Sequence, residues 1–134
     1  MVTNLMKNIL YKLGLIADYV VEQGTSGIWT YEKWASGKAV CFGKNRTQTD
    51  TWVTWGSLYE ANPYPTFTFP SGLFIEAPLL FPSAIPDGGG LLSCEVGSVT
   101  KDNIDYIMAV RPSPGRVGST GIINYTALAI GKWK

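Results

Sequence analysis

The 134-residue sequence contains no histidine and few charged residues, and both shortages limit what the protein can do. Without imidazole the chain cannot build a Ser-His-Asp or Cys-His nucleophile system, and nearly all zinc sites are excluded. Charged residues make up 16% of the chain, against about 25% in an average soluble protein. The net charge of +1 does not favour a strongly anionic partner, so we expect no nucleic acid and no anionic membrane.

Cysteine is scarce as well, since Cys41 and Cys94 are the only two in the chain. They are far apart and lack a Cys-x-x-Cys pattern, so we expect no metal site and no cofactor. The favoured interpretation is two free thiols packed as small apolar residues, and a disulfide between them is the alternative. No apolar run approaches the roughly 18 residues of a membrane span, and the start of the chain lacks the layout of a signal peptide. We therefore expect no membrane insertion.

The N-terminal segment has apolar residues at spacings of three and four, which predict a short amphipathic helix over residues 3–16. Thr3 or Asn4 can cap its start. About fourteen residues are marginal for an isolated helix, so its apolar stripe needs either the rest of the domain or copies of itself from other chains. We divide the chain into an oligomerising helix, residues 1–16, and a second domain, residues 17–134.

The second domain is rich in aromatic residues, glycine and proline, a mixture that suits short strands joined by turns. The clearest element is a hairpin, in which residues 28–34 and 38–42 flank the turn Ala35-Ser36-Gly37. Further strands are expected at Thr51 to Tyr59, Thr66 to Phe69, Leu73 to Glu76, Leu91 to Gly97, Ile104 to Val110 and Ile122 to Ile130. About seven or eight short strands at this spacing predict an all-β fold, an antiparallel β-sandwich.

The chain has no recognisable set of catalytic residues, but it is rich in large aromatic side chains, with five Trp and seven Tyr. Aromatic faces on loops often stack on sugar rings, whereas aromatic residues in strands are usually core. The strand patterns contain Trp29, Trp34 and Trp133, which are expected in the core. The candidate ligand-binding residues lie near breaks in the strand pattern or carry polar groups suited to a saccharide or an anion; they are Trp52, Tyr59, Tyr64, Asp87, Asn103, Arg111 and Arg116.

Several separated segments, spread over roughly residues 17–134, carry a family resemblance. They are Asp18-Tyr-Val-Val-Glu-Gln-Gly-Thr-Ser-Gly-Ile-Trp-Thr-Tyr31, Lys33-Trp-Ala-Ser-Gly37, Trp55-Gly-Ser-Leu-Tyr-Glu60, Pro70-Ser-Gly-Leu-Phe-Ile-Glu76, Thr100-Lys-Asp102, Arg111-Pro112 and Ala129-Ile-Gly-Lys-Trp-Lys134. Together they resemble segments of minor structural and tail proteins of phages and prophages of Gram-positive bacteria. The combination is far more specific than any one segment.

The resemblance implies the distal knob of a tail fibre or baseplate appendage, similar to the β-sandwich knobs of side tail fibres and to H-type lectins. It also implies a homotrimer, made in the bacterial cytoplasm and carried in the virion with other phage tail proteins. Such a knob attaches to a host cell-surface glycan without enzymatic activity, and no binding residue is transferred from the family. Two alternatives stay open: a structural tail or capsid decoration protein, and a polysaccharide depolymerase that uses a pair of carboxylates.

Overall fold

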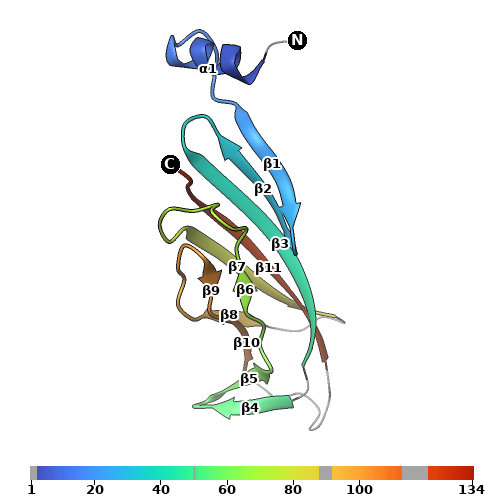
Figure 1. The fold of residues 1–134 in the computed structure, drawn as a ribbon. Helices are drawn as coiled ribbons and strands as arrows, with labels where there is room; N and C mark the ends of the chain where they lie inside the picture. The colour runs from blue at the N-terminus through green and yellow to red at the C-terminus, as the bar shows by residue number, and fades with distance from the viewer. Residues whose placement is uncertain (1–2, 50, 88–91, 113–120) are drawn as a thin grey trace.

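The computed structural model describes residues 3–49, 51–87, 92–112 and 121–134. Over these residues the chain forms one short N-terminal helix followed by β-strands whose pairings are all antiparallel (Figure 1). The elements are α1 Asn4–Lys12, β1 Val20–Ser26, β2 Trp29–Trp34, β3 Lys38–Thr49, β4 Thr51–Trp55, β5 Leu58–Asn62, β6 Phe67–Thr68, β7 Leu79–Pro86, β8 Ser93–Val96, β9 Asn103–Ile104, β10 Ile107–Arg111 and β11 Gly121–Lys132. The predicted all-β antiparallel architecture with an N-terminal helix is confirmed.

The largest sheet has five strands in the order β1-β2-β3-β11-β7. Its centre is the long pair β3 and β11, which run antiparallel over twelve residues of each strand. Successive side chains of a strand point to opposite faces. In β11 the alternate residues Ile123, Tyr125, Ala127 and Ala129 are all buried, so this face of the sheet covers the core.

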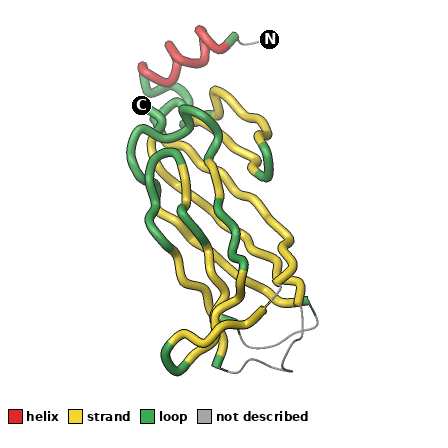
Figure 2. Tube along the Cα trace, turned by 60° about the horizontal axis from the view of Figure 1, so that its bottom comes forward, coloured by secondary structure: helices red, strands yellow, loops and turns green. Residues whose placement is uncertain are grey.

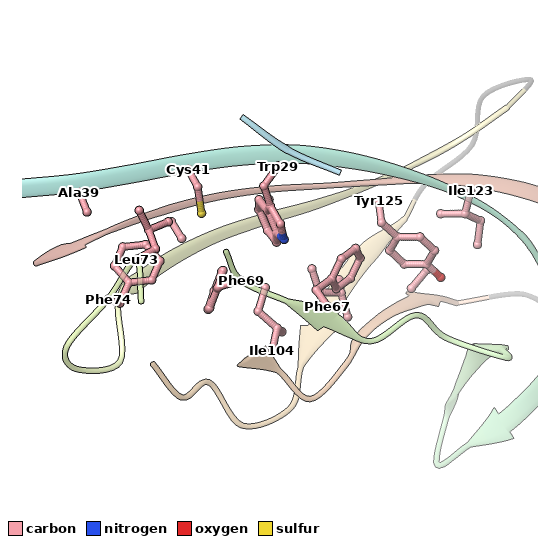
Figure 3. Packing of buried hydrophobic residues seen from close by; sticks show 14 of the residues in the cluster. Trp29, Ala39, Cys41, Phe67, Phe69, Leu73, Phe74, Ile104, Ile123 and Tyr125 are labelled. Atoms are coloured by element: carbon pink, nitrogen blue, oxygen red, sulfur yellow. The ribbon is translucent and has the colours of Figure 1, made fainter. Parts of the chain in front are cut away.

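The second layer consists of a four-stranded sheet, in the order β4-β5-β10-β8, and the two-stranded pair β6 and β9. Figure 3 shows the buried cluster between this layer and the five-stranded sheet. Trp29 projects from β2 into the cluster, with its ring centroid 5.3 Å from that of Phe69 and 6.2 Å from that of Phe67. Its indole Nε1 donates a hydrogen bond of 2.7 Å to the carbonyl oxygen of Thr68. The core position predicted for Trp29 is therefore correct.

The predicted hairpin is present as β2 and β3, joined through a turn in which Gly37 has φ of +98°. Other strand predictions were wrong in detail. The segment expected as one strand from Thr51 to Tyr59 is split between β4 and β5, because Gly56 adopts φ of +59° and reverses the chain. The segment from Leu73 to Glu76 forms no strand, although Leu73 is buried in the core.

Strands β1 and β7 were missed by the sequence analysis. Strand β7 contains Pro82 and Pro86, and proline argues against a strand unless the strand lies at a sheet edge. The structure places β7 at the edge of the five-stranded sheet, where proline is tolerated. Strand β1 lies at the opposite edge and is largely exposed, so it lacks the apolar alternation that marks a strand.

The helix α1 is shorter than the predicted range of 3–16. It is capped by Thr3, whose hydroxyl accepts a hydrogen bond from the backbone N–H of Met6 at 3.3 Å. None of its residues is buried, and the side chain of Leu5 is 71% exposed. Figures 1 and 2 show α1 beyond one end of the strands, where the ring of Tyr11 meets that of Tyr19 at a centroid distance of 6.2 Å. No helix among the described residues is long and apolar enough to cross a membrane.

Both cysteines are free thiols, as the favoured interpretation predicted. Cys41 lies in the core, whereas Cys94 is partly buried on β8. Burial raises the pKa of the Cys41 thiol to about 12, because the thiolate would lose its hydration there. Cys41 therefore acts as a small apolar core residue and is inert at neutral pH.

Candidate functional site

Three of the predicted ligand-binding residues, Trp52, Tyr59 and Arg111, lie together on adjacent strands. Strand β5 is paired with β4 on one side and with β10 on the other, and Tyr59 lies opposite Arg111. Because Tyr59 and Ala61 alternate along β5 and Ala61 pairs with Trp52, all three candidates occupy the same face of the sheet. This group is carried at the end of the body opposite α1, which we call the distal end (Figure 1).

The guanidinium group of Arg111 stacks on the ring of Trp52, with 3.5 Å between the guanidinium carbon and the ring centroid. This is a close cation–π contact, which fixes the direction of an otherwise long and mobile side chain. Burial lowers the pKa of the Arg111 guanidinium from its ordinary value, because the charged form loses hydration there. The ring face that Arg111 covers is not open to a sugar. Trp52 packs against the core cluster and Ala61 beside it is fully buried, so a saccharide at this place would meet only the exposed parts of the half-buried Arg111 and Tyr59.

The opposite face of the β4–β5 hairpin carries an aromatic residue that the sequence analysis missed. Trp55 is 46% exposed, while the other four tryptophans are buried or half-buried. Val53 and Leu58 are exposed near it on the same hairpin. The missed signal was the turn: Gly56 directly follows Trp55, and a glycine after an aromatic residue could have indicated a hairpin tip. Trp55 has the open indole surface that stacking on a sugar ring requires.

Tyr64 forms a pair of its own with Tyr106, with ring centroids 4.9 Å apart and an angle of 47° between the rings. The ring of Tyr106 is itself seated on Gly97, where an added Cβ would lie 2.6 Å from a ring carbon. Tyr64 thus packs against the well-packed ring of Tyr106, and part of the Tyr64 side chain stays exposed. It provides a second, smaller aromatic surface.

The remaining polar candidates are engaged in local contacts. Asp87 accepts hydrogen bonds from the Arg46 guanidinium and, at 2.7 Å, from the Asn124 side-chain amide. The Arg46 and Asn124 contacts hold the pKa of the Asp87 carboxyl below its usual value. Asn103 accepts a hydrogen bond of 2.9 Å from the Thr100 hydroxyl, which closes a turn before β9. These contacts stabilise the chain locally, and Arg116 lies outside the described residues.

The arrangement therefore unites three of the seven predicted residues and adds Trp55. Aromatic surfaces and one cation are suited to reversible binding of a polar ligand with flat apolar faces. Within the described ranges, no three His, Cys, Asp or Glu side chains lie close enough together to hold a metal ion. The described residues of the distal end form a partly aromatic surface.

Comparison with known proteins gave matches among solved structures. No protein-family model matches the chain, and no curated protein matches its sequence. An N-truncated R1-type pyocin tail fibre matches with a TM-score of 0.57 and 14% identity, over 98% of this chain and 99% of that chain. The shared property is the fold.

A C-terminal fragment of the R1 pyocin fibre of P. aeruginosa matches with a TM-score of 0.56 and 15% identity. This match covers 96% of the present chain but only 31% of the fibre fragment, so our chain corresponds to one part of that longer structure. At such low identity these matches show a common fold and transfer no residue.

Proposed function

We propose that this chain is a tail-fibre-type tip domain of a phage or phage-like particle, and that it attaches the particle to a saccharide on the host cell surface. The observation that carries the proposal is the fold likeness to a pyocin tail fibre, which extends over 98% of this chain and 99% of that one. The sequence motifs that resemble phage and prophage tail proteins of Gram-positive bacteria support it independently. We place the host among these bacteria.

Attachment would occur at the distal end, without a chemical step. The exposed indole of Trp55 stacks on the apolar face of a sugar ring. On the other face of the hairpin, Arg111 and Tyr59 supply hydrogen bonds to hydroxyl or acidic groups of the glycan. The polar contacts of Asp87 are already taken up by Arg46 and Asn124, so we give it no direct role.

The proposed form in the particle is a homotrimer joined to other tail proteins. A single shallow site with millimolar affinity corresponds to only about 4 kcal/mol of binding free energy. Three copies that engage a repetitive cell wall gain further affinity, because the second and third contacts occur at high effective concentration. Trimerisation thus turns three weak contacts into a firm attachment.

The test is binding of the fluorescently labelled domain to a panel of Gram-positive cells and to purified cell-wall glycans. We expect Trp55→Ala to lower cell binding about five- to thirtyfold, since loss of one stacked aromatic ring removes about 1–2 kcal/mol. The matched control is Ile75→Ala, a truncation at another exposed apolar residue away from the hairpin. Circular dichroism of both variants shows whether the fold is kept.

Three outcomes would overturn parts of the proposal. Equal binding by Trp55→Ala and the wild type would remove Trp55 from the site. Incorporation into particles with no binding to any cell or glycan would support a structural decoration protein. Release of reducing sugar from purified cell walls, abolished by carboxylate variants, would support a depolymerase.

A further inference from the structure

The five-stranded sheet carries apolar side chains on the face turned away from the core, which we call the outer face. Strand register places them in rows across β3, β11 and β7. The two apolar rows are Val40, Ile130 and Leu79, and Phe42, Leu128 and Phe81. Ile85 follows further along β7, and Ile28 lies beside Phe42 at a hollow in the sheet.

These side chains are unusually exposed for their size. Leu79 is 69% exposed, Phe81 55% and Phe42 53%. An antiparallel sheet with one face in water normally alternates apolar and polar residues. Strand β11 departs from this pattern, because Leu128 and Ile130 point outward between inward residues that are also apolar. Such a strand has the composition of one that is covered on both faces.

We propose that the outer face is the surface through which copies of this chain pack against one another. The inference rests on the trimer in the proposed function and adds which surface forms it. It does not involve the saccharide contacts of Trp55, which lies on the separate β4–β5 hairpin.

The shape of the outer face fits a second copy. A hollow of about 440 Å³ lies between Ile28, Phe42 and Phe81, with Thr126 and Leu128 also lining it. Large side chains therefore project beside a depression on the same surface. Around a threefold axis one side of this face meets the other side of the neighbour's face, so the projecting side chains of one copy can enter the depression of the next.

The charges around the apolar rows are of both signs. Lys38, Lys44 and Arg46 point outward on β3, as does Lys132 on β11. Glu32 lies on the outward side of β2, Asp87 is paired with Arg46, and Glu76 is paired with Lys132. The Arg46–Asp87 pair with Asn124 forms a satisfied polar group beyond the rows, like the rim of an ordinary interface. Because neither sign dominates, two identical faces are not kept apart by repulsion.

The helix α1 gives a second reason to choose a copy of this chain as the occupant. It has nine residues, too few for a stable isolated helix, and none of them is buried. Leu5, Ile9 and Leu13 are each at least half exposed. Association of identical chains brings together both unpartnered surfaces at once, the helices and the sheets, whereas an unrelated protein on the sheet would leave α1 uncovered.

The two apolar rows form the centre of a larger contact. Rows repeat every two residues, or about 7 Å, and three strands span about 10 Å, so the two rows alone cover roughly 100–200 Å² of the sheet. Ile28, Ile85 and the lining of the hollow extend this area toward the few hundred Å² at which an exposed apolar patch indicates an interaction site. In a closed ring each subunit contacts two neighbours, so α1 and the rim add to the area that each subunit buries.

The test compares Phe81→Asp and Phe42→Asp with the control Val53→Asp. Val53 is an exposed apolar residue of β4, so this control introduces the same carboxylate on a different sheet, away from the outer face. Sedimentation equilibrium and light scattering are expected to give three times the chain mass for the wild type and for Val53→Asp. The two phenylalanine variants are expected to give the mass of one chain with an unchanged circular dichroism spectrum.

The outcomes separate the two proposals. A monomeric wild type would overturn both the trimer and this inference. A trimeric wild type with trimeric Phe81→Asp and Phe42→Asp variants would overturn the inference alone and leave the trimer standing. Should the aspartate variants not fold, Phe81→Ser makes the same comparison with a small neutral side chain. Cell binding by Trp55→Ala reports separately on the saccharide site.

Discussion

Several glycines of the structure lie directly against aromatic rings. An added Cβ would lie 2.6 Å from the Tyr106 ring at Gly97 and 2.8 Å from the Phe74 ring at Gly131, and at Gly43 it would lie 2.8 Å from the Ile28 carbonyl oxygen beside the Trp29 ring. Real Cβ atoms do not approach other heavy atoms so closely, so larger residues would force the neighbours to move. The rings can therefore pack this close to the backbone only because glycine, which has no side chain, occupies these positions.

Gly43 allows a test of this packing. The Cβ of Gly43→Ala would meet backbone at Ile28 and also lie 3.0 Å from a ring carbon of Trp29. Overpacking of this kind typically costs about 1–3 kcal/mol. We expect Gly43→Ala to lower the free energy of unfolding by that amount in urea titrations. Gly121→Ala is the control, because a Cβ there meets nothing within 4 Å; an equal loss in both variants would contradict the interpretation.

At the level of the element, the sequence was informative where one face of a strand is apolar and the neighbouring turn is marked by glycine. The β2–β3 hairpin has both features and was predicted correctly. Residues 51–62 form two strands because Gly56 has a positive φ and reverses the chain. The residues on both sides of Gly56 favour strands, so the sequence pattern predicted a single strand. Trp55 was missed as a candidate for the same reason.

The candidate site could be predicted only in part, because its geometry depends on pairing between distant strands. Trp52 and Arg111 are 59 residues apart in the sequence, and only the common neighbour β5 brings them together. Local composition selected these aromatic and basic residues one by one and did not show that they meet. It also selected Asp87 and Asn103, whose polar atoms are used in contacts within the chain that no sequence pattern reveals.

The helix is the element whose contribution can be isolated. Because no residue of α1 is buried, a chain that lacks residues 1–16 is expected to fold with the same β spectrum by circular dichroism. Its thermal midpoint should nevertheless be lower and depend more strongly on protein concentration, since the helices contribute contacts between copies. Melting curves at several concentrations measure this. Identical curves for the full and truncated chains would show that α1 plays no part in association.

For the whole molecule, stability should depend on pH on the alkaline side. Burial raises the pKa of Cys41 from 9.0 to about 12 and that of Tyr125 from 10.0 to about 12. Above pH 9 the unfolded chain therefore releases protons that the folded chain retains. The unfolded state then binds fewer protons, so the free energy of unfolding falls as the pH rises toward 12.

Urea titrations at pH 7, 9 and 10.5 measure this dependence. We expect little change between pH 7 and 8, where the chain has no histidine to titrate, and a steady loss of stability above pH 9. In the variant Cys41→Ala the free energy of unfolding should fall less steeply with pH, because only Tyr125 of the two buried acidic groups is left. The difference in slope corresponds to at most one proton. A free energy of unfolding that stays constant to pH 10.5 would contradict the burial of both groups.

The two prolines of β7 have a consequence for how the molecule avoids aggregation. An edge strand with exposed apolar side chains is a template on which a further strand can add, and repeated addition leads to fibrils. Pro82 and Pro86 have no backbone N–H, so each interrupts the row of donors that such growth would need. The outer face of the sheet can thus be covered by other copies while its β7 edge resists the addition of further strands. This favours closed assemblies of fixed size over open-ended polymers.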